Sequence, residues 1–319
     1  MAVPMTTSIS QRLFDGRISE AILEGISQDK TYLDVVKEVS HDEISPNDKS
    51  VVRTMTFQSL GPIQQKGETT PIEFDAMAQG FVKETAHNEY GLAVAFSRKL
   101  WDDALFGLMR QGALELGKSV TLFNNLNAAR LYDNAFNTTY YTAQDGLALC
   151  STSHTSPNSA LLRSNKLAYS AQLSYSAIQE LLILGWRQVN MRRYSEPAWR
   201  PGDPIKVIVQ PEDYFTAEKI LSERALAGLE PDVDTNSINV LNKFKFRVVV
   251  NPYMTGTGST NMRLWFLQRE NQNSILLVNK VAPERRQYVD NDTLAIVHTL
   301  YTRSHQRISR WEETYGAGD

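Results

Sequence analysis

Alternation of apolar and polar residues is the clearest pattern in residues 51–96. Met55 and Phe57 fall on one face of an extended backbone, and Ile72 and Phe74 repeat the pattern further along. A period of two predicts strands, and the glycines and prolines between the runs predict turns. A ribbon with so few bulky side chains is only marginally stable in water by itself. We therefore expect the ribbon to lie on another surface, and we infer that this surface is a neighbouring copy of the chain.

Residues 97–136 carry the strongest helical pattern in the chain. At 1.5 Å per residue, a single helix over this stretch would be roughly 50 Å long. Ser97 is a suitable N-cap, and Asp102 and Asp103 suit the positive end of a helix dipole. We expect one long rod that crosses a flat domain. Its large apolar side chains share one broad arc at 100° per residue: Trp101, Leu105, Leu108, Met109, Leu116, Val120, Phe123, Leu126 and Leu131.

The segments on either side of these two elements have other patterns. Residues 1–50 hold more acidic than basic side chains, and isoleucines repeat at helical spacing from Ile18 to Ile26. This indicates an arm that packs on another part of the structure. Residues 137–170 are polar and rich in turn residues, which indicates a long connection with little regular structure.

From residue 173 onward the sequence predicts a compact α+β unit, because helical patterns alternate with short apolar runs. One helical pattern runs through Ile178 and Trp186, and a second helix follows Pro211 with Phe215 on its inner side. Continuous apolar runs bounded by turns are typical of buried strands. We expect such strands at residues 205–209, 248–250, 264–267 and 275–278, and a last one at 293–302, before the basic residues Arg303, Arg307 and Arg310.

This order of parts, together with four local motifs, resembles the major capsid protein of tailed double-stranded DNA bacteriophages. Members of that family share the capsid fold called Hong Kong 97 type. The resemblance covers roughly residues 80–319. The motifs are the passage from ribbon into helix at Tyr90–Asp103, the segment Asp145–His154, the strand–proline step Lys206–Pro211 and the final motif Trp311–Gly316.

The resemblance implies an α+β Hong Kong 97-like fold with five parts. Subunits would assemble as hexamers and pentamers into an icosahedral head that encloses double-stranded DNA. The parts would be an N-terminal arm at 1–50, an extended β-hairpin E-loop at 51–96, a peripheral domain with its spine helix at 97–170, an axial domain at 171–287, and return strands with the C-terminus at 288–319.

The resemblance also implies partners and a location. Some members of the family carry a scaffolding region of about a hundred residues before the ribbon, but here the ribbon begins near residue 51, so we expect a separate scaffolding protein. A portal protein and a decoration protein are further expected partners, and packaged DNA would be contacted without sequence specificity. The expected location is the capsid of the virion, after assembly in the host cytoplasm. No run of about 18 apolar residues occurs, so no membrane is expected as a partner.

The residues that we expect at contacts between subunits are apolar in the ribbon and charged elsewhere. Some family members cross-link a ribbon lysine to an asparagine of a neighbour, but no residue here can be matched to that chemistry, so we interpret Lys66 as an ordinary lysine. The candidates are Met55, Phe57, Lys66, Ile72, Phe74, Glu230, Asp232, Asp234, Arg303 and Arg307.

Motifs for catalysis or cofactor binding are missing from the sequence. It has no glycine-rich phosphate loop and no G-x-S-x-G nucleophile motif. Around His87, residues 84 and 87 would point to opposite faces of a strand, so we expect no metal site. Near His154, Ser151 and Ser153 lie in a turn-rich segment, which favours local hydrogen bonding over nucleophilic catalysis. We therefore predict no catalytic, cofactor-binding or metal-binding residue.

Charge and cysteine content limit the alternatives. The formal net charge is −3, which argues against a dedicated nucleic-acid-binding protein, and the single cysteine, Cys150, excludes internal disulfides. Two other structural functions stay open: the shell of an encapsulin-like compartment with a protein cargo, and a structural protein of a phage tail or baseplate. An enzyme is the third alternative, and a deep pocket with strongly shifted titratable groups would favour it.

Overall fold

The structure is a computed structural model in which two four-stranded sheets form the frame of the molecule. It describes residues 7–45, 51–58, 60, 63–68, 71–72, 74–103, 105–156, 159–188, 197–223, 238–258, 261–270 and 274–318. In order across each sheet, the first contains β1 (Lys37–Ser40), β10 (Ile275–Val289), β11 (Ile296–Ile308) and β4 (Asn88–Phe96), and the second contains β12 (Thr314–Ala317), β9 (Trp265–Arg269), β7 (Ile205–Val209) and β8 (Phe246–Val250).

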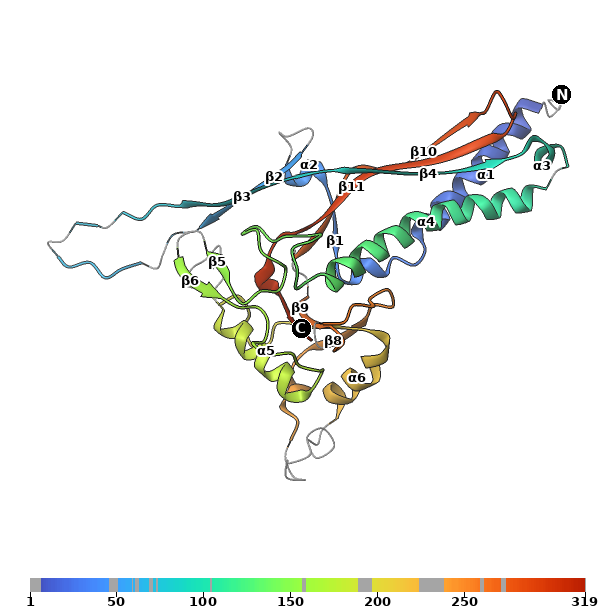
Figure 1. The fold of residues 1–319 in the computed structure, drawn as a ribbon. Coiled ribbons are helices and arrows are strands. Elements are labelled where there is room, and N and C mark those ends of the chain that lie inside the picture. Colours follow the sequence, from blue (N-terminus) through green and yellow to red (C-terminus); the bar gives the residue numbers. More distant parts are fainter. Residues whose placement is uncertain are drawn as a thin grey trace.

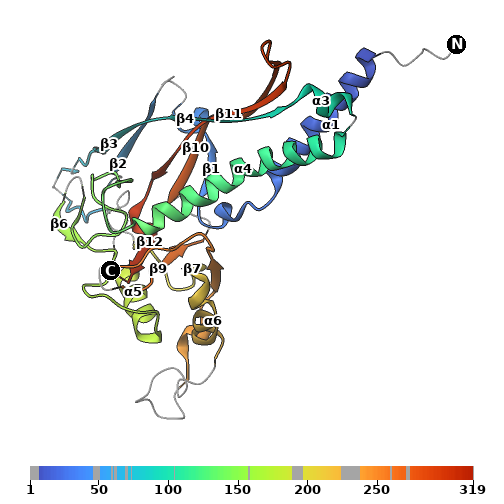
Figure 2. The same cartoon turned by 45° about the vertical axis from the view of Figure 1, so that its right-hand side comes forward.

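A long helix, α4 (Phe106–Asp133), runs beneath the first sheet, and α1 (Thr7–Ser27) lies along it (Figures 1 and 2). Gly25 and Gly117 meet where the helices touch: a Cβ on Gly117 would stand 2.2 Å from the carbonyl oxygen of Ile22. The absence of both Cβ atoms lets the two backbones approach closely. The side chains of Ile18, Ala21, Ile22, Phe96, Met109, Ala113, Leu116 and Leu300 form the buried cluster around this contact.

The long helix is shorter than predicted. A separate short helix, α3 (Arg98–Asp102), precedes it, and Ser97 caps α3 by accepting a hydrogen bond from the N–H of Leu100 at 3.4 Å. Asp102 lies at the C-terminal end of α3, where it pairs with Arg98 at 3.1 Å, so the predicted role at a helix N-terminus is wrong for it. The predicted apolar face is also too broad, because Leu105, Leu108 and Leu126 are exposed.

The second sheet lies in a body with a large apolar core. Helices α5 (Tyr175–Arg187) and α6 (Tyr214–Ser222) pack on it. Strands β7, β9 and β12 are almost entirely buried, whereas the edge strand β8 is mostly half-buried. The predicted strand at 205–209 is confirmed by β7. Phe215, predicted on the inner side of α6, is instead 80% exposed. The core contains Ile178, Leu181, Leu182, Trp199, Ile205, Val207, Val209, Ala217, Ile220, Trp265, Leu267 and Tyr315.

The two central strands of the first sheet, β10 and β11, form a hairpin much longer than the predicted strands. After Val278 the sequence turns charged, and Pro283 lacks the N–H that a strand interior needs. In the structure Pro283 lies at a register shift between Val281 and Glu284, so the hairpin continues past it as a bulged ribbon. Arg303 and Arg307, predicted to follow the strand, therefore belong to β11.

The predicted β-ribbon is present but covers only part of residues 51–96. β2 (Val51–Gln58) pairs with β3 (Ala78–Ala86) in a two-stranded antiparallel ribbon that projects from the body (Figure 1). After His87 the chain continues as β4, which pairs with β11 in the first sheet. Residues 88–96 are thus part of the chain's own sheet and not of the ribbon.

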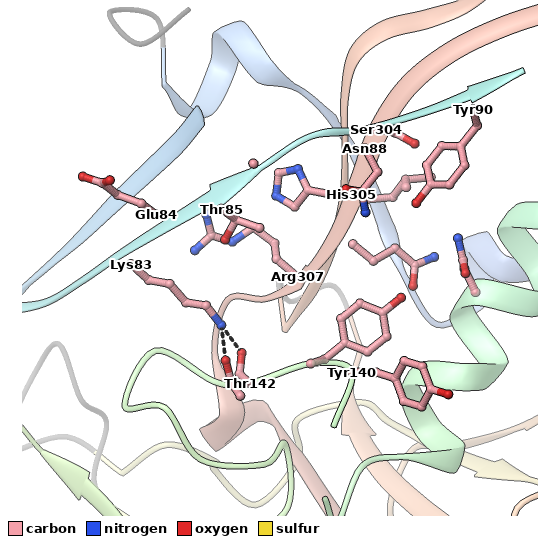
Figure 3. A pocket seen from close by; sticks show the side chains of 15 residues that line it. Lys83, Glu84, Thr85, Asn88, Tyr90, Tyr140, Thr142, Ser304, His305 and Arg307 are labelled. Carbon is pink, nitrogen blue, oxygen red and sulfur yellow. Dashed lines mark hydrogen bonds between the residues drawn. The ribbon is translucent and has the colours of Figure 1, made fainter. Parts of the chain in front are cut away.

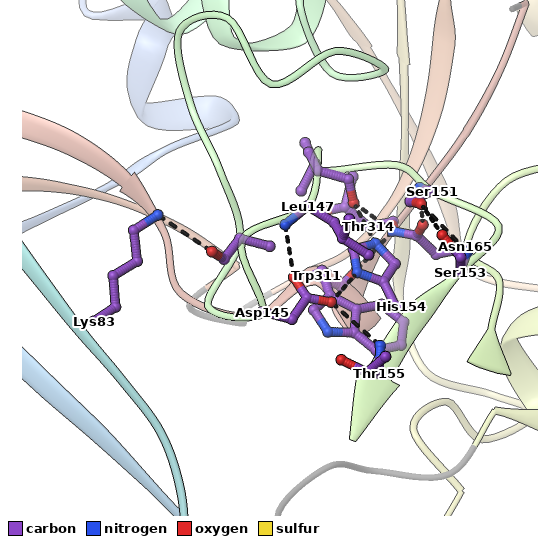
Figure 4. A network of polar contacts seen from close by, with 12 residues as sticks. Lys83, Asp145, Leu147, Ser151, Ser153, His154, Thr155, Asn165, Trp311 and Thr314 are labelled. Carbon is purple, nitrogen blue, oxygen red and sulfur yellow. Dashed lines mark hydrogen bonds and ion pairs between the residues drawn. The ribbon is translucent and has the colours of Figure 1, made fainter. Parts of the chain in front are cut away.

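The connection between α4 and α5 contains one short hairpin, β5 (His154–Ser156) with β6 (Ser159–Arg163), as expected for a segment of little regular structure. His154 Nδ1 lies 2.6 Å from Asp145 Oδ2, and the imidazole stacks on Trp311 at 4.0 Å between ring centroids (Figure 4). Ser151 and Ser153 bond with each other, so the predicted local hydrogen bonding is confirmed. The remaining short elements are α2 (His41–Ile44) and the 3-10 turns η1 (Thr31–Asp34), η2 (Pro211–Asp213), η4 (Val240–Lys243) and η5 (Trp311–Glu313).

Candidate inter-subunit surface

The ribbon carries a row of large apolar side chains that the chain itself leaves in solvent. Ile63 and Phe74, in the segment between β2 and β3, are as exposed as in an extended chain. Scattered apolar residues are normal on a protein surface, but a contiguous group marks an interaction site. The exposed side chains of this ribbon surface are Met55, Leu60, Ile63, Ile72, Phe74, Met77 and Val82.

The base of the ribbon is fastened to the body by packing and polar bonds. Val52 is fully buried against Leu276 and Val278 of β10. Arg307 of β11 donates a hydrogen bond to the hydroxyl of Thr54. Lys83 of β3 donates to the hydroxyl of Thr142 at 2.8 Å. The ribbon is therefore held at one end, and the described apolar side chains of its outer part are exposed.

Three buried histidines surround the point where β3 passes into β4. His87 Nε2 lies 2.9 Å from His41 Nδ1, and its Nδ1 lies 3.0 Å from His305 Nδ1. Burial, together with the charges of His41 and Arg303, lowers the pKa of His87 to about 4. Burial, with the charges of His87 and Arg307, lowers the pKa of His305 to about 3. The rings of His87 and His305 are therefore neutral at pH 7, and the three histidines connect the arm, the ribbon and the sheet through hydrogen bonds.

A second apolar surface lies between β4 and α4. The groove there has a volume of about 390 Å³. Leu92 of β4 and Leu122 and Leu126 of α4 are exposed on these two elements. The side chains of Tyr90, Leu92, Val120, Phe123, Pro283 and Leu300 line the groove.

The predicted contact residues fall into three groups. Met55, Lys66, Ile72 and Phe74 are exposed on the ribbon, where the contact was expected. Arg303 is partly buried on β11 and lies 3.8 Å from Glu89. Three candidates lie outside the described residues: Glu230, Asp232 and Asp234. The side chain of Phe57 is not described either.

Arg307 differs from the other candidates because it is buried within its own chain. Its side chain is 2% exposed and reaches the ribbon base, so it contacts Thr54 and not the outer surface. The sequence predicts a surface charge there, because arginine rarely lies inside a protein. Leu60, Ile63 and Met77 lie outside the alternating runs, so the pattern does not predict them as contact residues.

The acidic side chains near His87 face arginines. Glu84 pairs with Arg53 at 3.0 Å, and Glu89 faces Arg303. Within the described ranges, no three His, Cys, Asp or Glu side chains are grouped so that they could hold a metal ion. The described helices also include none that is long and apolar enough to span a membrane.

Comparison with known proteins identifies the family. The model of a family described as phage capsid protein matches residues 82–302, which is more than half of the chain. The chain belongs to the phage capsid protein family. The resemblance to phage capsid proteins is thereby confirmed, and the family consists of structural shell proteins and not of enzymes. No curated protein matches the sequence.

Solved structures share the fold of this capsid protein at low sequence identity. The capsid of cyanophage P-SCSP1u aligns with a TM-score of 0.55 and 10% identity, over 89% of this chain and 85% of that chain. The capsid of Ralstonia phage GP4 aligns with a TM-score of 0.55 and 9% identity, over 89% of this chain and 87% of that chain. A virus-like particle from Pyrococcus furiosus aligns with a TM-score of 0.51 and 8% identity, over 93% of this chain and 96% of that chain. The chain thus has the α+β capsid fold of the Hong Kong 97 type.

Proposed function

We propose that this capsid protein assembles as hexamers and pentamers into an icosahedral phage head that encloses double-stranded DNA. The exposed ribbon surface is the observation that carries the proposal. Its side chains, Ile63 and Phe74 above all, lie in solvent in the single chain, and burying them against a neighbour would be favourable at about 25 cal/mol per Å². Permanent interfaces typically bury more than about 2,000 Å² in total, and a closed shell repeats each contact many times.

The ribbon would lie over the adjacent subunit of the same capsomer. It is anchored at Val52 and directed away from its own body, so a neighbour can receive its outer part without any rearrangement of the anchor. The exposed candidates Met55, Lys66, Ile72 and Phe74 belong to this proposed contact. Arg303 of β11 is also assigned to this contact through the exposed part of its side chain, while its Nε faces Glu89 of the same chain.

The proposal extends to the other components of a phage head. We expect a separate scaffolding protein, a portal protein at one vertex, a decoration protein and non-specific contact with the packaged DNA, with assembly in the host cytoplasm. The net charge of −3 supports weak contact with DNA, because an acidic shell does not bind the phosphate backbone tightly. Mass spectrometry of purified particles would test each of these protein partners.

Electron microscopy of particles formed by the expressed chain, alone or with its scaffold, tests the proposed function. We expect closed shells with five-fold vertices. Rings or tubes would contradict the proposal and favour a tail protein. Closed shells isolated from infected cells that contain protein cargo and no DNA would favour an encapsulin-like compartment.

A further inference from the structure

A polar pocket lies at the ribbon base, between β3, β4, β11 and the connection after α4 (Figure 3). It has a volume of about 250 Å³. This is large enough for a small ion with some of its water. Among the side chains that line it are Lys83, Thr85, Tyr140, Thr142, His305 and Arg307.

The guanidinium of Arg307 lacks a charge partner. It donates to Thr54 through Nη2, while Nε and Nη1 are buried without any hydrogen-bond partner. Within the described residues, no carboxylate lies within 4.0 Å of it. Burial lowers the pKa of Arg307 to about 10, which still leaves it charged at neutral pH. A buried charge that is neither paired nor fully hydrogen-bonded costs several kcal/mol.

Lys83 brings a second cation to the same pocket. Its ammonium donates to the carbonyl and hydroxyl oxygens of Thr142 (Figure 3). It also donates to the carbonyl of Ala143 at 3.3 Å. Burial and the charge of Arg307 lower the pKa of Lys83 to about 8, and the charge of Asp145 opposes this only in part. Asp145 is already bonded to His154 at 2.6 Å, so it does not serve as the counter-ion of Lys83.

Other polar atoms near Arg307 lack partners too. His305 Nε2, Thr85 Oγ1 and both amide atoms of Gln306 are buried and have no hydrogen-bond partner. The one acidic residue of the lining, Glu84, pairs with Arg53 at 3.0 Å on the exposed side of the ribbon. The pocket thus combines two positive charges with polar groups that have no partner in the chain.

We propose that this pocket binds an oxyanion of the size of phosphate or sulfate, with Arg307 and Lys83 as its charge partners. An arginine fork matches two oxygens of such an ion, and charge-assisted hydrogen bonds are about twice as strong as neutral ones. A bound oxyanion would compensate both cations at once. It would also fasten the ribbon to the body, because Lys83 belongs to β3 and Arg307 to β11. Every residue of the site comes from one chain, so the proposal does not depend on shell assembly.

Binding of phosphate and sulfate to the full-length subunit tests the site. Thermal unfolding in sodium phosphate or sulfate is compared with unfolding in sodium chloride at equal ionic strength, and calorimetric titration gives the stoichiometry. We expect a saturable rise in Tm and one ion bound per chain. Equal Tm values in the three salts together with no titration signal would overturn the proposal.

Substitution locates the site. Arg307→Gln keeps a donor for Thr54 and removes the charge, and we expect it to bind phosphate at least about tenfold more weakly. Arg303→Gln, four residues earlier on β11 and outside the pocket lining, should bind as the unchanged chain does. Should Arg307→Gln fail to fold, Lys83→Met replaces it with the same expectation. Full binding by the folded variant would overturn the assignment.

The oxyanion could also be a carboxylate of a neighbouring copy, and assembled shells separate the two sources. If assembled shells still bind phosphate, the pocket is assigned to a free ion. If free subunits bind phosphate but assembled shells do not, the pocket is assigned to a neighbour's carboxylate, which would contact the same Arg307 and Lys83.

Discussion

The ribbon and the second sheet use apolar residues in opposite ways. In the sheet, Trp265 and Phe266 are fully buried, whereas in the ribbon Phe74 and Ile63 are fully exposed. The body around the sheet therefore contains the apolar contacts that stabilise it, while the outer ribbon contains almost none. The difference indicates that the stability of a single subunit resides in the body, and that the apolar side chains of the ribbon contribute free energy only when a partner covers them.

The largest effect on subunit stability is expected from the core of the body. Trp265 is fully buried, and its indole N–H donates to the carbonyl of Ala171 at 3.0 Å. Trp265→Ala should lower the free energy of unfolding by about 3–5 kcal/mol, because it leaves a cavity and an unpaired carbonyl. Urea denaturation followed by circular dichroism measures this. A loss below about 1 kcal/mol would show that the body is not the stable part of the subunit.

The contact between α1 and α4 should show the next largest effect. Gly117→Ala places a Cβ 2.2 Å from a backbone oxygen of α1, so the helices must separate, at a cost of about 1–3 kcal/mol. Gly107→Ala on the same helix is the matched control, because a Cβ there meets no atom within 4 Å. The control should be neutral or stabilising by up to about 1 kcal/mol. Equal effects of the two substitutions in urea denaturation would refute the close helix contact.

Acid should weaken the ribbon base through the buried histidines. The folded-state pKa values of His87 and His305, about 4 and about 3, lie below the ordinary value of 6.5. The unfolded chain therefore binds more protons below pH 6.5, so stability is complete above that pH and falls as the pH drops toward 4. His41, Lys83, Lys280, Arg303 and Arg307 surround the two rings and oppose further positive charge.

The expected loss between pH 7 and pH 4.5 is on the order of 1–3 kcal/mol for each of the two histidines. Urea denaturation at a series of pH values measures it. His87→Gln should reduce the fall in the free energy of unfolding with decreasing pH, because one of the two groups with a lowered pKa is gone. The same pH dependence in the variant and in the unchanged chain would mean that the acid sensitivity arises elsewhere.

The smallest effect on subunit stability is expected from the ribbon surface. Phe74→Ser removes a fully exposed ring, so the free energy of unfolding should change by less than about 0.5 kcal/mol. The denaturation experiment used for Trp265→Ala applies here too. A loss of more than 1 kcal/mol would show that the ribbon packs on its own chain in solution.

Parts of the fold with a strong local pattern could be predicted from the sequence. The run Ile205–Val209 is apolar at most positions because the strand is covered on both sides, and β7 has the same bounds. The ribbon was predicted from its alternation, and its outer apolar residues are exposed. The five-part division of the chain stays a prediction.

Other parts depend on contacts that no local pattern contains. The hairpin of β10 and β11 continues past Pro283 because a bulge accommodates the proline, and the sequence around it looks like a loop. The buried side of α4 uses glycine and alanine, such as Gly117 and Ala113, which a search for large side chains ignores. Arg307 is buried because Thr54, distant in sequence, lies beside it.

Assembly of a ribbon variant tests the central claim most directly. Ile63→Ser with Phe74→Ser removes the two large apolar side chains that are most exposed among the described residues, and Lys66→Ala in the same segment is the polar control. Electron microscopy and sedimentation then compare the yield of closed shells. The account predicts a folded double variant that forms few or no shells and a control that assembles normally. Shells from the double variant at the yield of the unchanged chain would contradict the account.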